Sequence, residues 1–276
     1  MNKHICIIVA VKQTRMKFVS SLFALIFFAE TYLLAGEVPD VSASDSAVSC
    51  VSIGDTPYSF KAKRFIVPVA LMATGIAAVE SDWAKDLNHD IRDNLQDIVG
   101  SHVRIDDYMQ YSPVAAMYAL HLFRVDSKHD FIDQTILFAT SHAIMTSSAR
   151  CMKIVWDEER PSSHATNSFP SGHTATAFMC AHLLAREYWD VSPWIGIGGY
   201  TVAAGVGFLR MYNDRHWLTD VVGGAGLGIM SVEVAHLLYP FLAKHIFKGR
   251  KNHNIYLLPY YQTETQAVGM TCNLRF

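Results

Sequence analysis

Three short stretches of the chain carry the residue types for phosphate chemistry: two histidines, several lysine and arginine side chains, and an aspartate four residues after the second histidine. The stretches are KIVWDEERP (residues 153–161), PSGH (170–173) and RMYNDRHWLTD (210–220). Lysine and arginine side chains neutralise phosphate groups, and a histidine held by a carboxylate is the usual arrangement of an activated nucleophile. We therefore expect the three stretches to meet in one site that handles a phosphate group.

The cations and the PSGH stretch have the chemistry to bind a phosphate dianion. Arg160 and Arg210 offer planar donor pairs that match phosphate oxygens, and Lys153 adds a mobile point charge. Gly172 lets the backbone approach an oxyanion closely, and the N–H groups that open the following helix point toward it. The hydroxyl of Ser171 is a further donor. We expect all five residues to bind the phosphate.

The two histidines have different expected roles. His216 and Asp220 are four residues apart, a spacing that places both on one face of a helix. A carboxylate bound to one imidazole nitrogen fixes the tautomer and leaves the other nitrogen free to attack phosphorus. His173 remains available as a general acid for the leaving oxygen. Each stretch alone also fits a helix end or a turn, so the prediction depends on their joint occurrence.

These residues resemble the type 2 phosphatidic acid phosphatase superfamily, which includes bacterial class A acid phosphatases and vanadium haloperoxidases. The family pattern is a Lys, six residues and Arg-Pro; then Pro-Ser-Gly-His; then Ser-Arg, five residues, His, three residues and Asp. The chain matches this pattern at Lys153, Arg160, Pro161, Pro170, Ser171, Gly172, His173, Arg210, His216 and Asp220. Leu209 departs from it, because it occupies the position of the family's serine.

The resemblance implies a phosphatase that works through a phosphohistidine. His216 would attack phosphorus, His173 would protonate the leaving group and Asp220 would orient His216. The phosphate would be bound by Lys153, Arg160, Ser171, Gly172 and Arg210. No metal ion or cofactor is implied. Leu209 removes a hydroxyl contact, so we expect a shift in rate or specificity.

Apolar helices must hold the three stretches together. Apolar residues at helical spacing predict an all-α fold, a helical bundle of about six core helices. The expected helical segments are 65–79, 83–107, 108–125, 131–155, 174–189, 193–209 and 218–243. Alternation over 268–276 predicts a strand, and 254–262 is its expected hairpin partner. The predicted organisation is a leader (1–35), a linker (36–64), a helical phosphatase domain (65–250) and a C-terminal hairpin (254–276).

The composition and the N-terminus favour an envelope protein. Of the 276 residues 51% are hydrophobic, the mean hydropathy is +0.17, and the net charge of -2 gives no sign of nucleic-acid binding. Lys12, Arg15 and Lys17 precede the apolar run 18–29, and Ala35 follows, as in a secretory leader; a retained membrane anchor is the alternative. No protein partner can be inferred from the sequence.

The substrate and the cellular compartment are inferred from the resemblance and from the apolar segments of the chain. The whole sequence resembles lipid A phosphatases of Gram-negative bacteria. We expect a lipid phosphate as substrate, of the lipid A, undecaprenyl pyrophosphate or phosphatidic acid type, in an enzyme of the inner membrane with a periplasm-facing site. A soluble periplasmic acid phosphatase of broad specificity is the first alternative. A vanadate-dependent haloperoxidase and a non-catalytic phosphate-binding protein remain open as further alternatives.

Overall fold

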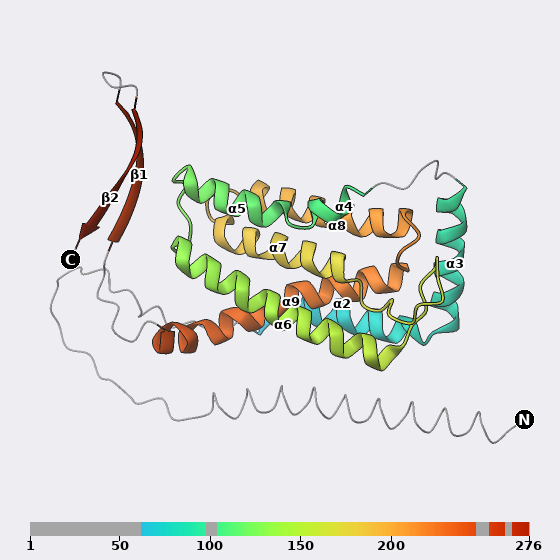
Figure 1. The fold of residues 1–276 in the computed structure, drawn as a ribbon. Helices are drawn as coiled ribbons and strands as arrows, with labels where there is room; N and C mark the ends of the chain where they lie inside the picture. Colours follow the sequence, from blue (N-terminus) through green and yellow to red (C-terminus); the bar gives the residue numbers. More distant parts are fainter. Residues whose placement is uncertain (1–61, 98–103, 247–253, 263–266, 276) are drawn as a thin grey trace, which may run out of the picture. The chain divides into compact units, whose positions relative to one another are not determined.

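The structure is a computed structural model that describes residues 62–97, 104–246, 254–262 and 267–275 (Figure 1). The predicted leader and most of the predicted linker lie outside these residues. The elements are α2 (Lys63–Val79), α3 (Asp82–Gln96), α4 (Asp106–Met109), α5 (Ser112–Leu122), α6 (Phe131–Trp156), α7 (Gly172–Tyr188), α8 (Pro193–Tyr212), α9 (Leu218–Ile246), β1 (Asn254–Gln262) and β2 (Ala267–Arg275). The predicted all-α class is confirmed for the helical part of the chain.

Helix α7 is the central helix of the bundle. It packs against α5, α6 and α8, and 12 of its 17 residues are buried (Figure 1). Helix α9 approaches it very closely through glycines. A Cβ on Gly224 would lie 2.7 Å from the carbonyl oxygen of Ser171, and one on Gly228 would lie 2.3 Å from that of Ala175. Glycine at these two positions therefore sets the start of α9 directly against the start of α7.

Successive long helices run in opposite directions, and this brings the predicted site residues to one end of the bundle. Helices α6 and α8 end there, and α7 and α9 begin there (Figure 1). Helix α3 bends by 92° from α2 and packs beside the loop between α8 and α9. The same end of the bundle therefore collects four helix termini and one face of α3.

Two of the expected helices are divided in the structure. The segment 83–107 was expected to be one helix, but α3 ends at Gln96 and Asp106 begins the separate helix α4. The segment 108–125 is also divided, because α4 ends at Met109 and α5 begins at Ser112. Pro113 explains the second break: it lacks an N–H group and is tolerated in the first turn of a helix, which is where α5 places it.

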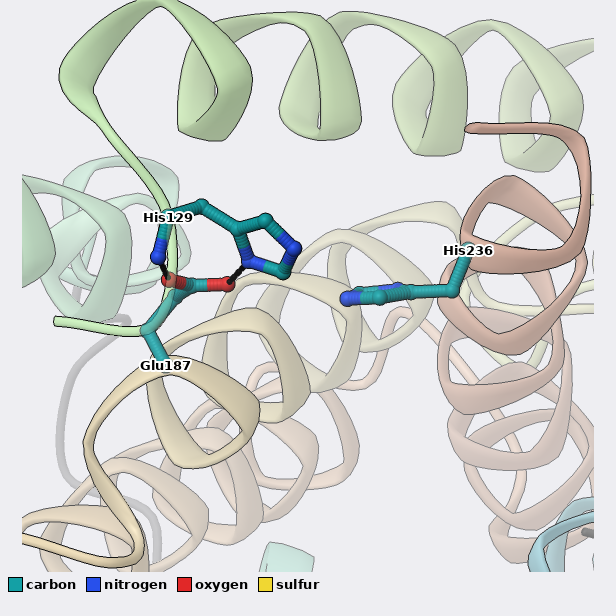
Figure 2. Close-up of side chains that lie close together, drawn as sticks. All are labelled: His129, Glu187 and His236. Atoms are coloured by element: carbon teal, nitrogen blue, oxygen red, sulfur yellow. Dashed lines mark hydrogen bonds and ion pairs between the residues drawn. The ribbon is translucent and has the colours of Figure 1, made fainter. Parts of the chain in front are cut away.

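Buried ion pairs join the helices away from the predicted site. Glu233 of α9 accepts hydrogen bonds from Arg186 of α7 at 2.7 and 2.8 Å and contacts His182 at 2.7 Å. Glu187, near the end of α7, accepts the backbone N–H of His129 at 3.0 Å and lies 2.7 Å from Nδ1 of the same residue (Figure 2). Because buried carboxylates require partners, these contacts fix how the helices pair.

The last two elements are described separately from the bundle. Strands β1 and β2 pair antiparallel, with Asn254 opposite Arg275 and Gln262 opposite Ala267. These strands span the segments in which the sequence predicted a hairpin.

One helix of the described part is long and apolar enough to cross a membrane. Its candidate segment is Leu218–Ala243, with a mean hydropathy of 1.6 and two thirds of the window buried inside the protein. Helices α2 and α3 pass the same test only as a bent pair. The length and composition of Leu218–Ala243 fit a membrane span and equally a buried core helix.

Candidate active site

His216 and Asp220 form a buried pair at the start of α9. Nδ1 of His216 lies 3.3 Å from Oδ2 of Asp220, and Nε2 of His216 makes no hydrogen bond to any described residue. His216 lies in the loop before the helix, so the two residues do not stack on one helical face as the spacing suggested. The contact forms because Asp220 Oδ2 also accepts the backbone N–H of Trp217 at 2.9 Å, which folds the loop back.

Ser168 contacts both members of this pair, and no sequence pattern indicated it. Its hydroxyl donates to Oδ2 of Asp220 at 2.5 Å and lies 3.4 Å from Nδ1 of His216, and the whole residue is buried. The hydroxyl therefore helps to orient the carboxylate that orients His216. No spacing rule distinguishes a serine two residues before Pro170 from an ordinary loop serine.

Burial keeps the imidazole of His216 neutral. Burial lowers its pKa to about 4; the neighbouring Asp220 opposes this shift, and the charges of Lys153 and Arg160 add to it. A neutral ring whose Nδ1 faces a carboxylate carries its proton on Nδ1. Nε2 then has a free lone pair, as a nucleophile requires.

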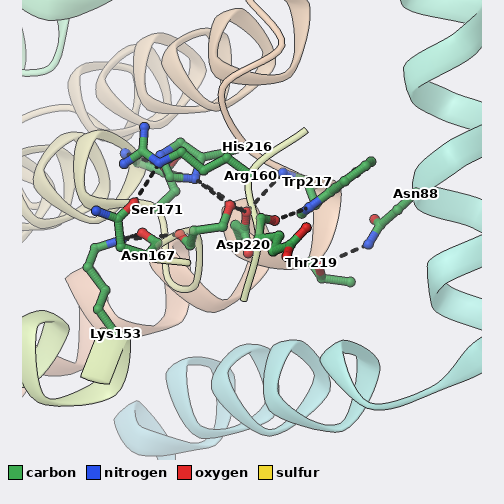
Figure 3. A network of polar contacts seen from close by, with 12 residues as sticks. Asn88, Lys153, Arg160, Asn167, Ser171, His216, Trp217, Thr219 and Asp220 are labelled. Carbon is green, nitrogen blue, oxygen red and sulfur yellow. Dashed lines mark hydrogen bonds and ion pairs between the residues drawn. The ribbon is translucent and has the colours of Figure 1, made fainter. Parts of the chain in front are cut away.

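Lys153 and Arg160 lie beside His216 without an acidic partner in the described part of the chain. Lys153 Nζ donates to the carbonyl oxygens of Asn167 at 2.5 Å and Ser168 at 3.1 Å, and Arg160 Nε donates to Oδ1 of Asn167 at 2.8 Å (Figure 3). Burial, followed by the charge of Arg160, lowers the pKa of Lys153 to about 8. Partly buried cations that are held only by neutral groups create a strong positive potential, which an anion would relieve.

Arg210 presents a buried donor with no partner. The residue is 7% exposed; its Nη1 forms an ion pair with Asp106, while its Nε has no hydrogen-bond partner in the described structure. Its charge also lowers the pKa of Arg160, after the larger effect of burial, so the two guanidinium groups lie within electrostatic reach. Because an unsatisfied buried donor is costly, this N–H group is a natural contact for a phosphate oxygen.

His173 has a carboxylate partner of its own. Its Nε2 lies 2.9 Å from Oδ1 of Asp107, which is also 3.7 Å from Nη1 of Arg210. Burial and the charge of Arg210 lower the pKa of His173, and Asp107 opposes them. The sequence analysis places Asp106 and Asp107 only in a surface helix. Two adjacent aspartates were the one sign in the sequence that this segment could contact Arg210 and His173.

Ser171 and Gly172 lie at the start of α7, and Ser171 connects it to the start of α9. The backbone N–H of Ser171 donates to the carbonyl oxygen of Asp220 at 3.0 Å. Its hydroxyl oxygen caps α7 by accepting from the backbone N–H of Thr174 at 3.5 Å and from the Thr174 hydroxyl at 2.9 Å, so its own proton is free to donate. A Cβ added at Gly172 would meet no atom within 4 Å. Packing therefore does not require glycine there.

The structure brings the predicted site residues to one end of the bundle. Leu209 is next to Arg210 in α8, and its carbonyl accepts the backbone N–H of Asn213 at 2.9 Å. The arrangement can bind a tetrahedral oxyanion with Lys153, Arg160 and Arg210 and present an oriented, neutral imidazole to it.

Comparison with known proteins agrees with this chemistry. The family model of the PAP2 superfamily matches residues 138–244. Residues 138–244 are therefore similar to the PAP2 superfamily. The matched segment contains every predicted site residue and Ser168, whereas Asp106, Asp107 and the whole of α3 lie before it.

The individual relatives cover different parts of the chain. A lipid A 1-phosphatase of Porphyromonas gingivalis is 34% identical over 174 residues, which make up 61% of this chain and 38% of that protein. The chain thus spans less than half the length of this relative. Among solved structures, LpxE of Aquifex aeolicus has 21% identity and a TM-score of 0.41, covering 55% of this chain and 93% of that one. A transmembrane PAP2 type phosphatidylglycerolphosphate phosphatase of Bacillus subtilis has 19% identity and a TM-score of 0.41, with coverage of 67% and 99%.

Proposed function

We propose that the protein is a phosphatase that removes a phosphate group from a lipid phosphate through a phosphohistidine. The observation that carries this proposal is the buried His216–Asp220 pair beside two partly buried cations that have no acidic partner among the described residues. The unpartnered Nε of Arg210 supports it. The similarity to the PAP2 superfamily and to the lipid A 1-phosphatase of P. gingivalis agrees with it.

The proposed reaction has two steps. Nε2 of His216 attacks phosphorus, the bond from phosphorus to the leaving oxygen breaks, and His173 gives its proton to that oxygen. Asp220 stabilises the positive charge that the imidazole of His216 acquires. In the second step a water molecule attacks the phosphohistidine, His173 accepts the water's proton, and inorganic phosphate leaves with the His216 ring restored.

The cations supply the electrostatic part of catalysis. Negative charge on the equatorial oxygens meets donors that the fold already holds in place, and such preorganised groups are often the largest single contribution to rate. Lys153 and Arg160 are held by Asn167, and Arg210 is held by Asp106. Lys153 and Arg160 therefore have no ion pair within the described part of the chain to break when the phosphate binds.

We further propose that the enzyme works at a membrane of the bacterial envelope, with the periplasmic side as the predicted location of its site. Large apolar side chains are exposed next to the site: Ile154, which follows Lys153, is 71% exposed, and Tyr108, which follows Asp107, is 82% exposed. Exposed apolar surface of this kind is typical of contact with lipid or with another protein. The apolar segment Leu218–Ala243 supports the same location.

Phosphate release and trapping of the intermediate test the proposed function. Wild-type protein should release phosphate from lipid phosphates in mixed micelles. A ³²P-labelled substrate should leave label on wild-type protein after rapid quenching and none on His216→Ala. Normal labelling of His216→Ala would contradict the assigned nucleophile. Equal rates on soluble esters and lipid phosphates would favour the broad-specificity alternative over a lipid phosphatase.

A further inference from the structure

Helix α3 contacts the loop that carries His216, at the end of the bundle where α8 stops and α9 begins (Figure 1). The helix precedes the segment 138–244 that matches the PAP2 family model, so its contacts come from another part of the chain. Three of its side chains reach the loop or the first turn of α9: Asn88, His89 and Arg92. Helix α3 is therefore placed where it can determine the position of His216.

Arg92 forms the strongest of these contacts. Its Nε and Nη2 donate to the two carboxylate oxygens of Asp214 at 2.7 and 3.0 Å, and such paired bonds fix orientation as well as distance. Asp214 is buried, lies two residues before His216, and has a φ of 56°, in the left-handed region. Because this backbone conformation is uncommon for a residue other than glycine, an ion pair that holds the side chain also stabilises the turn. Arg92 thus constrains the turn that leads into His216.

Trp217, the residue after the proposed nucleophile, is held from two sides. On the side of α3, the His89 ring meets the indole edge-on with 5.0 Å between centroids, and the guanidinium of Arg92 lies 5.9 Å from the indole centroid. On the other side, the indole Nε1 donates to the carbonyl oxygen of Glu159 at 2.8 Å. The backbone N–H of the same tryptophan donates to Asp220 at 2.9 Å. Movement of the indole ring would therefore disturb the hydrogen bond that folds the loop back.

Asn88 adds a contact with the first turn of α9. Its Nδ2 donates to Oγ1 of Thr219 at 3.1 Å, and both residues are buried (Figure 3). Helix α2 leads α3 to this place, because a Cβ on Gly75 of α2 would lie only 2.7 Å from Cα of Gly223 in α9. The 92° bend that follows α2 then turns α3 toward the loop. Helix α3 therefore contacts the chain on both sides of the proposed nucleophile.

We propose that α3 is a positioning element for the nucleophile, with Arg92 as its main residue. The inference rests on the proposed phosphatase function and adds to it, because α3 keeps His216 in contact with Asp220 while the cations bind the phosphate. Nδ1 of His216 lies 3.3 Å from Oδ2 of Asp220, at the long end of hydrogen-bond distances, so a small displacement of the loop would break this contact. A loop released from α3 would leave the imidazole without its orientation and open to water.

Kinetics of Arg92→Ala, measured on the full chain in detergent with a soluble aryl phosphate, test the proposal. We expect kcat to fall about tenfold or more, because a misplacement of about 1 Å can cost about 100-fold in rate. KM should change less than about twofold, because the phosphate-binding cations stay in place. Lys85→Ala is the matched control and should change neither value. Lys85 is an exposed cation two turns before Arg92 on α3, and it forms no ion pair with any residue that the structure describes.

The pKa of His216 separates positioning from simple stabilisation of the fold. Burial, the largest cause, lowers this pKa to about 4 in the wild-type protein. In Arg92→Ala, water should reach the loosened ring and weaken each of the effects on it, so the pKa should rise toward the ordinary 6.5. The acid limb of kcat/KM should rise with it. NMR titration of the imidazole measures the pKa without depending on turnover.

Two milder substitutions carry the test if Arg92→Ala does not fold. Arg92→Lys keeps the charge but not the paired N–H groups, so its kcat should lie below that of the wild type and its His216 pKa above. Asp214→Asn keeps a residue that tolerates the left-handed conformation and removes the ion pair, so it should reproduce the loss of kcat and the rise in pKa. Combined with Arg92→Ala, it should cause little further loss, since both substitutions remove one contact.

An unchanged kcat in the Arg92 and Asp214 variants would overturn the proposal. A fall in kcat and Tm with an unmoved pKa of His216 would overturn it too, because α3 would then only stabilise the fold.

Failure of the proposed function would look different. A wild-type protein that hydrolyses no phosphate ester, but whose His216 pKa rises in Arg92→Ala, would refute the phosphatase and keep the positioning role of α3. An active wild-type phosphatase whose kcat and His216 pKa are the same in Arg92→Ala would refute the positioning role and keep the phosphatase.

Discussion

At the scale of single residues, the two histidines differ in how their carboxylate partners are placed. Asp220 is buried and shares Ser168 with His216, whereas Asp107 is half exposed at the short helix α4. Burial lowers the pKa of both histidines. The consequence is favourable for a nucleophile, which must be neutral, and unfavourable for a general acid, which must be protonated. We therefore expect Asp107 to support the proposed general acid His173, with which it is in contact at 2.9 Å.

The pH dependence of kcat/KM should reflect these two shifts. Its acid limb should lie near pH 4, because protonation of His216 below its pKa of about 4 removes the attacking lone pair. Its alkaline limb should lie below pH 6.5, the ordinary histidine value, because His173 has a lowered pKa and must carry a proton. Rates with a soluble aryl phosphate from pH 3 to 10 measure both limbs. An alkaline limb found only near pH 8 would instead assign that limb to Lys153.

Asp107→Asn should move the alkaline limb to lower pH. The substitution removes a negative charge 2.9 Å from Nε2 of His173, so the protonated ring loses stabilisation and its pKa falls further. We expect kcat to fall about tenfold at the wild-type optimum, with KM much less affected. Asp107→Glu should restore part of the rate and part of the shift. A uniform loss of rate with an unmoved limb would mean that Asp107 is only structural.

Gly172→Ala should lower activity without lowering stability. The new Cβ would meet no protein atom within 4 Å, so the fold has room for it. It would occupy the space where we expect a phosphate oxygen to approach the start of α7, and kcat/KM should fall about tenfold or more. Gly198→Ala is the matched control, because a Cβ there also meets no atom and Gly198 lies within α8. Unchanged kcat/KM in Gly172→Ala would remove Gly172 from the phosphate site.

At the scale of elements, the residues of the predicted site lie together in the structure because they sit at helix ends that the sequence marks. PSGH opens α7, and Arg210 lies in the last turn of α8. The sequence analysis did not identify three residues, Ser168, Asp107 and Asn88. They lie on segments whose placement depends on breaks and bends between helices. Asn88 meets Thr219 across 131 positions of the chain, a contact set by the 92° bend between α2 and α3. The spacing of apolar residues along the sequence does not indicate such a bend between helices.

Glu233→Gln should destabilise the bundle without changing the site. Glu233 is 1% exposed and pairs with Arg186, so the substitution removes a countercharge from a largely buried guanidinium group. Breaking a buried pair in this way costs about 3–5 kcal/mol, which corresponds to a fall in Tm of about 10 °C. Thermal unfolding in detergent measures the shift, and Glu80→Gln on an exposed helix end is the control. An unchanged Tm would show that the pair contributes no net stability.

At the scale of the whole molecule, the exposed apolar side chains bear on where the protein works. Ile66, Val67 and Val69 are exposed on α2, and Trp194 and Ile197 are exposed on α8. Apolar residues exposed on more than one helix of the bundle fit the contact with lipid that we propose. The lipid substrate that we propose would then reach the site without leaving the membrane.

If the apolar side chains of α2 contact lipid, replacing them with polar ones should weaken the binding of the protein to the membrane. Alkaline carbonate should leave the wild-type full chain in the membrane pellet. A variant with serine at positions 66, 67 and 69 should release a larger fraction and lose activity on lipid phosphate in vesicles, because polar side chains facing lipid are costly. Its rate on a soluble aryl phosphate should stay near wild type, since α2 carries no site residue. Complete release of the wild-type chain by carbonate would support the soluble periplasmic alternative, in which the same substitutions would change neither activity.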